Sequence, residues 1–179
     1  MTLELITGPA RSGKSRWAEH RAALCGLQVH YFATGPQLPD DPAWQERLRQ
    51  HRLRRPPTWR CVEVGHGLAG ALDNLGPNDV ALVDSLGTWV SGALQLETGT
   101  WQQHCQVLLG SLGHCSARVL LVSEQTGWGV VPATPLGGLF RDRLGRLEEQ
   151  LSHGCEHLWL VVAGRAIDLM PASQAVPRD

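Results

Sequence analysis

The residues with the clearest chemistry lie near the start of the chain, where glycine, lysine and serine occur at fixed spacing. Positions 8–15 fit the phosphate-binding pattern G-x-x-x-x-G-K-[ST] without a gap. They are Gly8, Pro9, Ala10, Arg11, Ser12, Gly13, Lys14 and Ser15. The pattern predicts backbone N–H groups around a phosphate, a catalytic Lys14 along the β- and γ-phosphates, and a Ser15 hydroxyl on Mg²⁺. We therefore expect a nucleoside triphosphate to bind with Mg²⁺.

The residues on either side of this loop fit the same interpretation. Residues 3–7 alternate in polarity and predict a short strand, and residues 15–24 predict a helix. A strand, a glycine turn and a helix N-terminus direct several N–H groups at one point. The alternative, a glycine turn that matches by accident, does not account for this context. Lys14 is also the only lysine in the chain, at a position that suits a flexible point charge.

A basic segment is the second stretch that could do chemistry. Between positions 44 and 60 there are six arginines and one glutamate. Asp41 and Pro42 predict a helix start, with aspartate as N-cap and proline at the first helical position. The helix is expected to run to about Arg54, because Pro56 and Pro57 disfavour helix in the residues before them.

On this helix Arg47, His51 and Arg54 or Arg55 share one face. Repulsion from the arginines predicts a lowered pKa for the His51 imidazole, and therefore a neutral, nucleophilic ring at neutral pH. Such a ring, surrounded by donors for phosphate oxygens, could attack an α-phosphorus and form a phosphoramidate. The alternatives are a solvated basic face or a nucleic-acid patch, in which His51 has no chemical role.

The remaining pattern predicts the frame that holds these residues. A hydrophobic strand over 80–84 ends in Asp84, which is typical of the Walker B carboxylate that reaches Mg²⁺. Thr34, Gly35 and Pro36 follow a strand at 29–33 and are expected next to the phosphate loop. Further strands are predicted at 59–64, 118–122 and 157–162 (the last one buried), with an edge strand at 166–170. Helices are predicted at 67–75, 88–96, 100–112 and 136–152, with Gly99 between the second and third. This alternation predicts an α/β fold with a mostly parallel sheet and helices on both faces.

Composition narrows the class of protein. A chain of 179 residues with 42% hydrophobic residues predicts a single domain over 1–170 and a flexible tail at 171–179. A net charge of −1 predicts no general attraction to nucleic acid or membrane, and no apolar run approaches the ~20 residues of a membrane span. Five scattered cysteines without C-x-x-C spacing favour neither a zinc site nor disulfides and suit a reducing cytoplasm.

Four stretches taken together resemble the bifunctional adenosylcobinamide kinase / adenosylcobinamide-phosphate guanylyltransferase family of cobalamin biosynthesis. They are the phosphate loop at 8–15, the block Gln-His-Arg-Leu-Arg-Arg-Pro at 50–56 with Trp59 and Glu63, the block at 83–90, and the loop at 127–132 with 140–142, 145–146 and 159–164. The resemblance covers about residues 3–170.

The resemblance implies a RecA-like P-loop domain, a cytoplasmic homotrimer and two reactions. The first phosphorylates the aminopropanol hydroxyl of the corrinoid adenosylcobinamide with GTP or ATP. The second transfers GMP from GTP to that phosphate through a guanylylated histidine, giving adenosylcobinamide-GDP. The family's histidine aligns with His51. Its nucleotide contacts align with residues 8–15 and with Thr34, Gly35, Pro36, Arg52, Leu53, Arg54, Arg55, Glu63 and Asp84.

The chain departs from the family pattern after the strand at 118–122. The family usually has Ser-Asn-Glu-Val-Gly, whereas residues 123–127 are Ser-Glu-Gln-Thr-Gly. The carboxylate has moved by one position, which reverses the face it presents at a strand end. The sequence after Pro132 is also altered. Two other functions remain open: a P-loop small-molecule kinase without a covalent histidine, and a RecA-like nucleotide-dependent module that binds nucleic acid through its arginines.

Overall fold

The computed structural model describes residues 2–36, 38–129 and 131–177. Met1, Gln37, Val130, Arg178 and Asp179 lie outside the described residues, as does the side chain of Arg47. The predictions for the Arg47 side chain, for Val130 in the loop at 127–132 and for the end of the tail therefore fall outside the described part.

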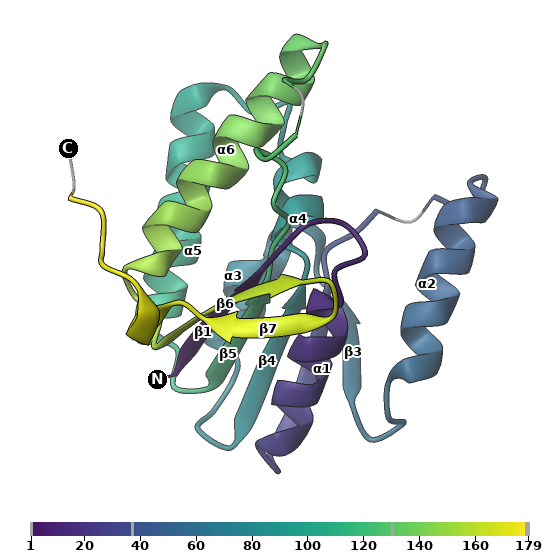
Figure 1. Cartoon of the computed structure of the whole chain (residues 1–179). Coiled ribbons are helices and arrows are strands. Elements are labelled where there is room, and N and C mark those ends of the chain that lie inside the picture. The colour runs from purple at the N-terminus through teal and green to yellow at the C-terminus, as the bar shows by residue number, and fades with distance from the viewer. Residues whose placement is uncertain (1, 37, 130, 178–179) are drawn as a thin grey trace.

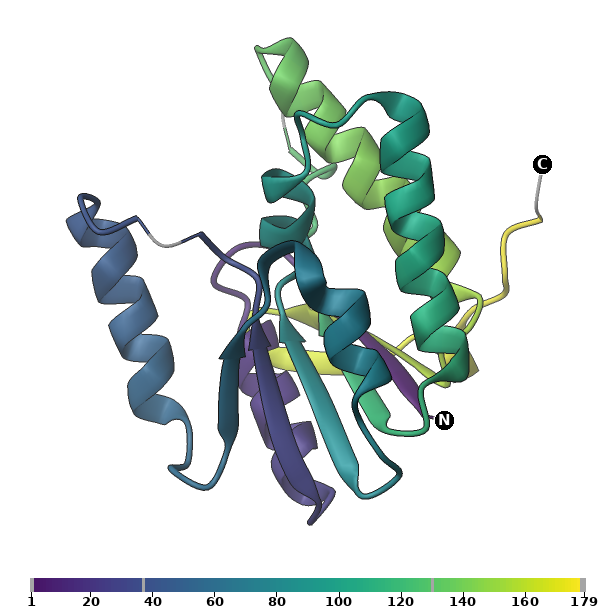
Figure 2. The ribbon, with the colours of Figure 1, turned by 180° about the vertical axis from the view of Figure 1, so that it is seen from behind.

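A seven-stranded sheet forms the centre of the molecule (Figures 1 and 2). Its strand order is β3-β2-β4-β5-β1-β6-β7, and all neighbours are parallel except β6 and β7. The strands are β1 (Leu3–Thr7), β2 (Gln28–Ala33), β3 (Arg60–Glu63), β4 (Asp79–Asp84), β5 (Arg118–Val122), β6 (His157–Val162) and β7 (Arg165–Asp168). The mostly parallel sheet and the edge position of the last strand confirm the predictions.

Helices cover both faces of the sheet, which produces two hydrophobic cores. Leu5 belongs to the core that also contains residues of α3, α4, α5 and α6, whereas the next residue, Ile6, belongs to the core that contains Ala18 and Ala22 of α1. Strand side chains alternate between faces, so each strand supplies both cores. The helices are α1 (Lys14–Leu24), α2 (Pro42–Arg54), α3 (Leu68–Asp73), α4 (Leu86–Gly92), α5 (Thr98–His114) and α6 (Pro135–Ser152), with short 3₁₀ turns η1 (Gly65–Gly67) and η2 (Met170–Ala172).

The predicted boundaries of α4 and α5 were wrong. Ser85 caps α4 in a reciprocal capping box with Thr88, so this helix starts earlier than expected, and it ends at Gly92. The α5 helix begins at Thr98, and Gly99 lies in its first turn rather than between two helices. Arg143 of α6 stabilises the connection between α4 and α5 by donating hydrogen bonds to its carbonyl oxygens. Because about fifty residues separate Arg143 from these acceptors, the local sequence could not predict where the two helices end and begin.

Three smaller expectations also needed correction. The strand at 157–162 was predicted to be buried, but in β6 only Val161 is buried, because the outer neighbour is the short edge strand β7. The strand predicted at 59–64 is the shorter β3, and all four of its residues are exposed at the opposite edge of the sheet. The helix predicted at 67–75 is the turn η1 followed by the shorter α3.

Arg143→Ala is expected to lower the free energy of unfolding by about 2–4 kcal/mol. The guanidinium is buried and donates to the carbonyl oxygens of Ala93, Leu94 and Leu96 at 2.9, 3.3 and 2.6 Å. Truncation leaves these acceptors without their donor. Urea denaturation measures the change, with Arg146→Ala as the control because Arg146 is exposed on the same helix. Equal losses in the two variants would contradict the role of Arg143.

Acid is expected to destabilise the protein partly through Glu4. This buried carboxylate accepts hydrogen bonds from Arg21 (2.9 and 2.8 Å) and from Trp159 (2.9 Å), with Arg118 at 3.3 Å. Burial acts to raise the pKa of Glu4, but these donors outweigh it and hold the pKa below its ordinary value of 4.5. Ionised Glu4 therefore contributes stability above about pH 4.5, and this contribution is lost as the pH falls below that value. The free energy of unfolding, measured by urea denaturation between about pH 3 and 7, should fall less steeply toward low pH in Glu4→Gln than in the wild type. Equal slopes in the two proteins would contradict this role of Glu4.

Candidate active site

The phosphate loop connects β1 to α1 at the carboxyl end of the sheet. Gly13 precedes α1 with φ of 104°, a left-handed conformation that favours glycine. A Cβ atom on Gly8 would collide with the backbone oxygen of Val161. No side chain caps the first turn of α1, and within the described residues the buried Ser12 hydroxyl has no hydrogen-bond partner. The loop thus presents donors of the kind that bind phosphate oxygens.

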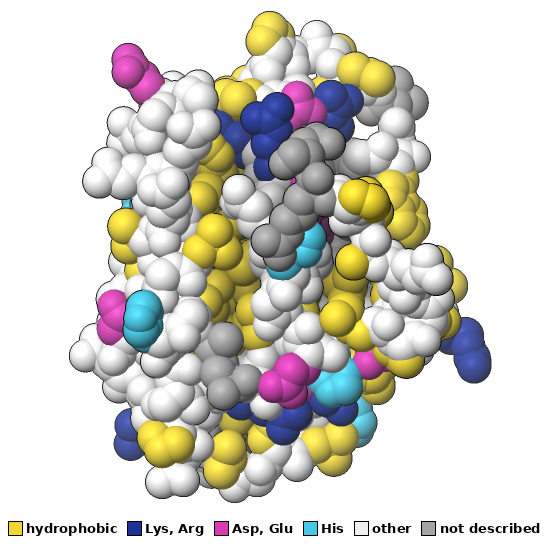
Figure 3. Space-filling model, turned by 90° about the vertical axis from the view of Figure 1, so that its left-hand side faces the viewer, with side chains coloured by type: hydrophobic (Ala, Val, Ile, Leu, Met, Phe, Trp, Pro, Cys, Tyr) yellow, Lys and Arg dark blue, Asp and Glu magenta, His cyan; other side chains and the backbone are white. Residues whose placement is uncertain are grey.

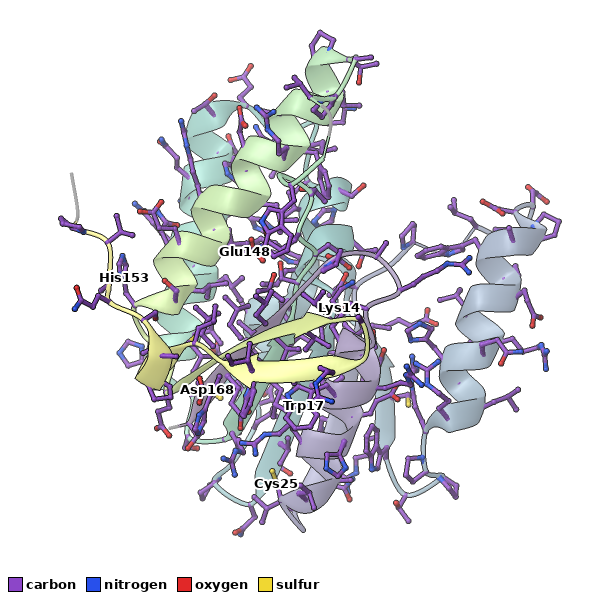
Figure 4. All side chains as sticks on the ribbon, in the orientation of Figure 1. Lys14, Trp17, Cys25, Glu148, His153 and Asp168 are labelled. Atoms are coloured by element: carbon purple, nitrogen blue, oxygen red, sulfur yellow. The ribbon has the colours of Figure 1, made fainter. Side chains whose placement is uncertain are left out.

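Lys14 occupies the position that the sequence pattern assigns to it. Figure 4 shows it at the N-terminal end of α1. Its side chain is buried, and its Nζ donates to the backbone oxygen of Pro9 at 3.3 Å. The ammonium therefore lies at the loop itself, where it can bind the phosphates of a nucleotide.

A cleft of about 730 Å³ separates this loop from α2. The helix stands apart from the sheet in Figure 1. It begins as predicted, because Asp41 accepts a hydrogen bond from the Trp44 N–H at 3.0 Å and proline follows. The loop residues 11–16 form one wall, and His51 and Arg54 of α2 contribute to the other. The two sequence features with the clearest chemistry therefore line one cleft.

A second cavity, of about 200 Å³, continues beyond His51 toward the ends of β2, β4 and β5. His51 and Trp44 line both cavities. The other residues of the second cavity are Tyr31, Ala33, Gly35, Leu48, Arg52, Arg55, Cys61, Val62, Glu63, Asp84, Ser85, Thr88 and Glu124. His51 thus lies between the phosphate loop and a group of carboxylates at the sheet edge.

The imidazole of His51 contacts Asp84, a carboxylate that sequence reasoning placed at the metal but not at the histidine. His51 Nδ1 lies 3.5 Å from Asp84 Oδ2, and the Tyr31 hydroxyl donates to the same oxygen at 2.7 Å. Burial acts to raise the pKa of Asp84, but hydrogen bonds from His51, Tyr31 and Ser15 outweigh it and lower the pKa below 3.8. The negative charge of Asp84 therefore opposes the electrostatic effect that the arginines were expected to have on His51.

The arginine block at 52–55 divides between the site and the surface. Arg54 donates to both carboxylate oxygens of Glu19 on α1, at 3.1 and 3.0 Å, and its Nη2 lies 3.3 Å from His51 Nδ1. The guanidinium of Arg55 lies 3.4 Å from the centre of the Tyr31 ring. Leu53 is 67% exposed and lines neither cavity. Arg52 and Glu63 form an exposed pair at 3.4 Å at the mouth of the second cavity.

The segment at 34–36 is not next to the phosphate loop, which corrects the prediction. Strands β4 and β5 lie between β2 and β1 in the sheet. Thr34 is buried and donates to the backbone oxygen of Ser85 at 2.6 Å, while the backbone oxygen of Pro36 accepts from the Trp44 indole at 2.9 Å. Of the three residues only Gly35 lines a cavity. The local sequence of a parallel strand does not specify which strands lie beside it. The predicted position of residues 34–36 next to the phosphate loop was therefore wrong.

Sequence reasoning missed Tyr31 and Ser85 as members of the site. Tyr31 lies in a hydrophobic strand, and nothing in its neighbourhood distinguishes it from a core residue. Glu124 was noticed only as a departure from a family pattern. It lies in the second cavity with its carboxylate toward Ser85, which accounts for its place in the site.

Comparison with known proteins identifies the family. Residues 4–169 match the family model for cobinamide kinase / cobinamide phosphate guanyltransferase. This chain belongs to that family. The bifunctional adenosylcobalamin biosynthesis protein CobU of Escherichia coli (strain K12) is 36% identical, over 92% of this chain and 98% of the relative. The corresponding protein CobP of Pseudomonas aeruginosa is 38% identical, over 93% and 96%.

Solved structures support the RecA-like P-loop fold of this cobinamide kinase family member. The RadB recombinase matches 89% of this chain and 73% of its own, with a TM-score of 0.50 and 17% identity. A protein of Pyrococcus horikoshii OT3 matches 94% and 85%, with a TM-score of 0.57 and 7% identity. In the described part of the chain, none of the helices combines the length and apolarity needed to cross a membrane.

Proposed function

We propose that this chain performs both reactions of its family, with His51 as the covalent nucleophile. It phosphorylates the aminopropanol hydroxyl of adenosylcobinamide with GTP or ATP, and then transfers GMP from GTP to the new phosphate. The observation that supports this best is the position of His51, which lines the cleft opposite the phosphate loop and also the second cavity. One histidine can thus meet both a loop-bound nucleotide and a second substrate.

The surroundings of the imidazole favour Nε2 as the attacking nitrogen. Nδ1 faces Asp84, and with its proton donated toward this carboxylate the Nε2 lone pair is available. In this tautomer Arg54, which can only donate, contributes its charge but no hydrogen bond to Nδ1. Nε2 forms a bond to the α-phosphorus while the bond from that phosphorus to the bridging oxygen breaks and pyrophosphate leaves. The loop amides, Lys14 and the nearby arginines stabilise the departing charge. A phosphate oxygen of the corrinoid then attacks the same phosphorus and releases His51.

Ser15 and Asp84 would hold Mg²⁺. Both supply oxygen, the ligand type that Mg²⁺ prefers, and the Ser15 hydroxyl already hydrogen-bonds the ionised Asp84. When bound there, Mg²⁺ would supply positive charge to offset that of the triphosphate.

The proposal includes the remaining contacts and the assembly that the family resemblance implies. The nucleotide contacts are residues 8–15, 34–36 and 52–55 with Glu63 and Asp84. Residues 1–170 are taken as one nucleotide-binding and transferase domain that assembles as a cytoplasmic homotrimer.

The test is covalent labelling of the purified protein. We expect GTP labelled at the α-phosphate, added with Mg²⁺, to leave label on the protein through a denaturing gel. A phosphoramidate bond makes this label stable in alkali and labile in acid. GTP labelled at the γ-phosphate should leave none, because pyrophosphate departs. Tight GTP binding without covalent label would overturn the histidine mechanism and favour a P-loop kinase of ordinary type.

The charges on α2 give little support to a nucleic-acid-binding module. Arg49, Arg52 and Arg54 pair with Glu46, Glu63 and Glu19, respectively. The face shown in Figure 3 lies on the side opposite α2, and there basic and acidic side chains occur together near the two ends instead of forming a basic strip. Binding to single-stranded DNA that weakens steeply with salt would be the result that favours this alternative.

A further inference from the structure

Glu124 is a carboxylate in the second cavity that guanylyl transfer does not use. It follows β5, which lies between β1, the strand leading into the phosphate loop, and β4, the strand ending in Asp84. Its Oε1 accepts from the Ser85 hydroxyl at 2.6 Å, and its Oε2 accepts from the Gly87 N–H at 3.0 Å. Its side chain lines the same cavity as His51 and Asp84.

We propose that Glu124 accepts the proton of the substrate hydroxyl in the phosphorylation step. This role rests on the proposed function. The hydroxyl oxygen forms a bond to the γ-phosphorus while the bond from that phosphorus to the β–γ bridging oxygen breaks. The O–H bond of the substrate breaks at the same time, its proton passes to the Glu124 carboxylate, and the nucleoside diphosphate leaves.

The fold fixes the carboxylate in place. A Cβ atom on Gly87 would overlap the Glu124 carboxylate, so the side chain packs tightly against the start of α4. Its two hydrogen bonds use one lone pair on each oxygen and leave acceptor capacity for a substrate hydroxyl. The neighbouring Gln125 turns the other way and donates to Thr7 and Glu148, both at 3.0 Å.

The electrostatic surroundings suit a proton acceptor. Burial raises the pKa of Glu124 above its ordinary value of 4.5, and the charge of Asp84 adds to this, although the Ser85 hydroxyl and Lys14 oppose it. A raised pKa makes a carboxylate a stronger base.

Three other carboxylates in and around the site are less suited to this step. Asp84 is engaged by Tyr31 and His51. Glu63 is 53% exposed and pairs with Arg52. Glu148 projects from α6 (Figure 4), is held by Thr7 and Gln125, and lines neither of the two cavities.

The test measures the two reactions separately in Glu124→Gln. Glutamine keeps the size of the side chain and one acceptor for Ser85 or Gly87, but it cannot take up the proton. With adenosylcobinamide as acceptor we expect kcat for phosphorylation to fall by about 10²–10⁴-fold, with KM within about threefold. With phosphorylated adenosylcobinamide as acceptor, GMP transfer and the label on His51 should stay within about threefold of the wild type.

Two further variants complete the test. Glu124→Asp keeps a carboxylate and should retain more phosphorylation than Glu124→Gln. Glu149→Gln makes the same change at an exposed glutamate and should have no effect. A parallel loss of both reactions in Glu124→Gln would show a structural role and overturn the proposal, as would unchanged phosphorylation. A wild-type protein that does not phosphorylate the corrinoid would instead overturn the proposed function, and this role with it.

Discussion

His51→Asn is expected to separate the two reactions: GMP transfer falls by at least about 10⁴-fold, and phosphorylation of adenosylcobinamide stays within a few-fold. The loss is large because asparagine provides no ring nitrogen to form the phosphoramidate. Phosphorylation is largely retained because it requires the phosphate loop, which the substitution does not touch. The corrinoid products formed from labelled GTP report both reactions in one assay.

The control for this prediction is the same substitution at an exposed histidine. His114 is the last residue of α5, lies outside both cavities, and forms a hydrogen bond with the backbone oxygen of Gly110 in its own helix. His114→Asn should leave both reactions unchanged. If His51→Asn retained GMP transfer, the nucleophile would have to be another group. If it lost both reactions with unchanged thermal stability, His51 would serve in nucleotide binding rather than in covalent catalysis.

Lys14→Met is expected to impair both reactions, each by about 10²–10³-fold in kcat. The Lys14 ammonium is buried at the phosphate loop. Each reaction breaks a bond in a triphosphate that is proposed to bind at this loop. Methionine keeps the length of the side chain but removes the charge that stabilises the leaving phosphate. Lys14→Arg should also be impaired, because the planar guanidinium does not replace a compact ammonium in a buried position. Single-turnover assays of each reaction measure these effects.

The comparison variant is Arg60→Ala, which removes an exposed cation on β3 outside both cavities. Its reactions should match the wild type. Loss of only one reaction in Lys14→Met would mean that the two reactions use different triphosphate positions. That result would contradict a single phosphate loop serving both steps.

The sequence by itself determined the local structural features of this protein. The phosphate loop, the helix start at Asp41 and the strand ending in Asp84 each depend on backbone conformations and periodicity within a few residues, and each was predicted close to its observed bounds. The fold class followed from the alternation of strands and helices. The expectations of a guanine nucleotide and of a covalent histidine came from resemblance to a family, because spacing alone left His51 open to a role on a basic surface.

Only the tertiary structure decided which of these features lie close together. Strand order places the end of β2 away from the phosphate loop, and the fold brings Asp84 against His51 across 32 intervening residues. It also turns Glu124 into the cavity and holds the connection between α4 and α5 through Arg143. These contacts depend on how strands are ordered and helices packed. Sequence periodicity specifies which face of an element is buried, but it does not specify the partner against which that face packs.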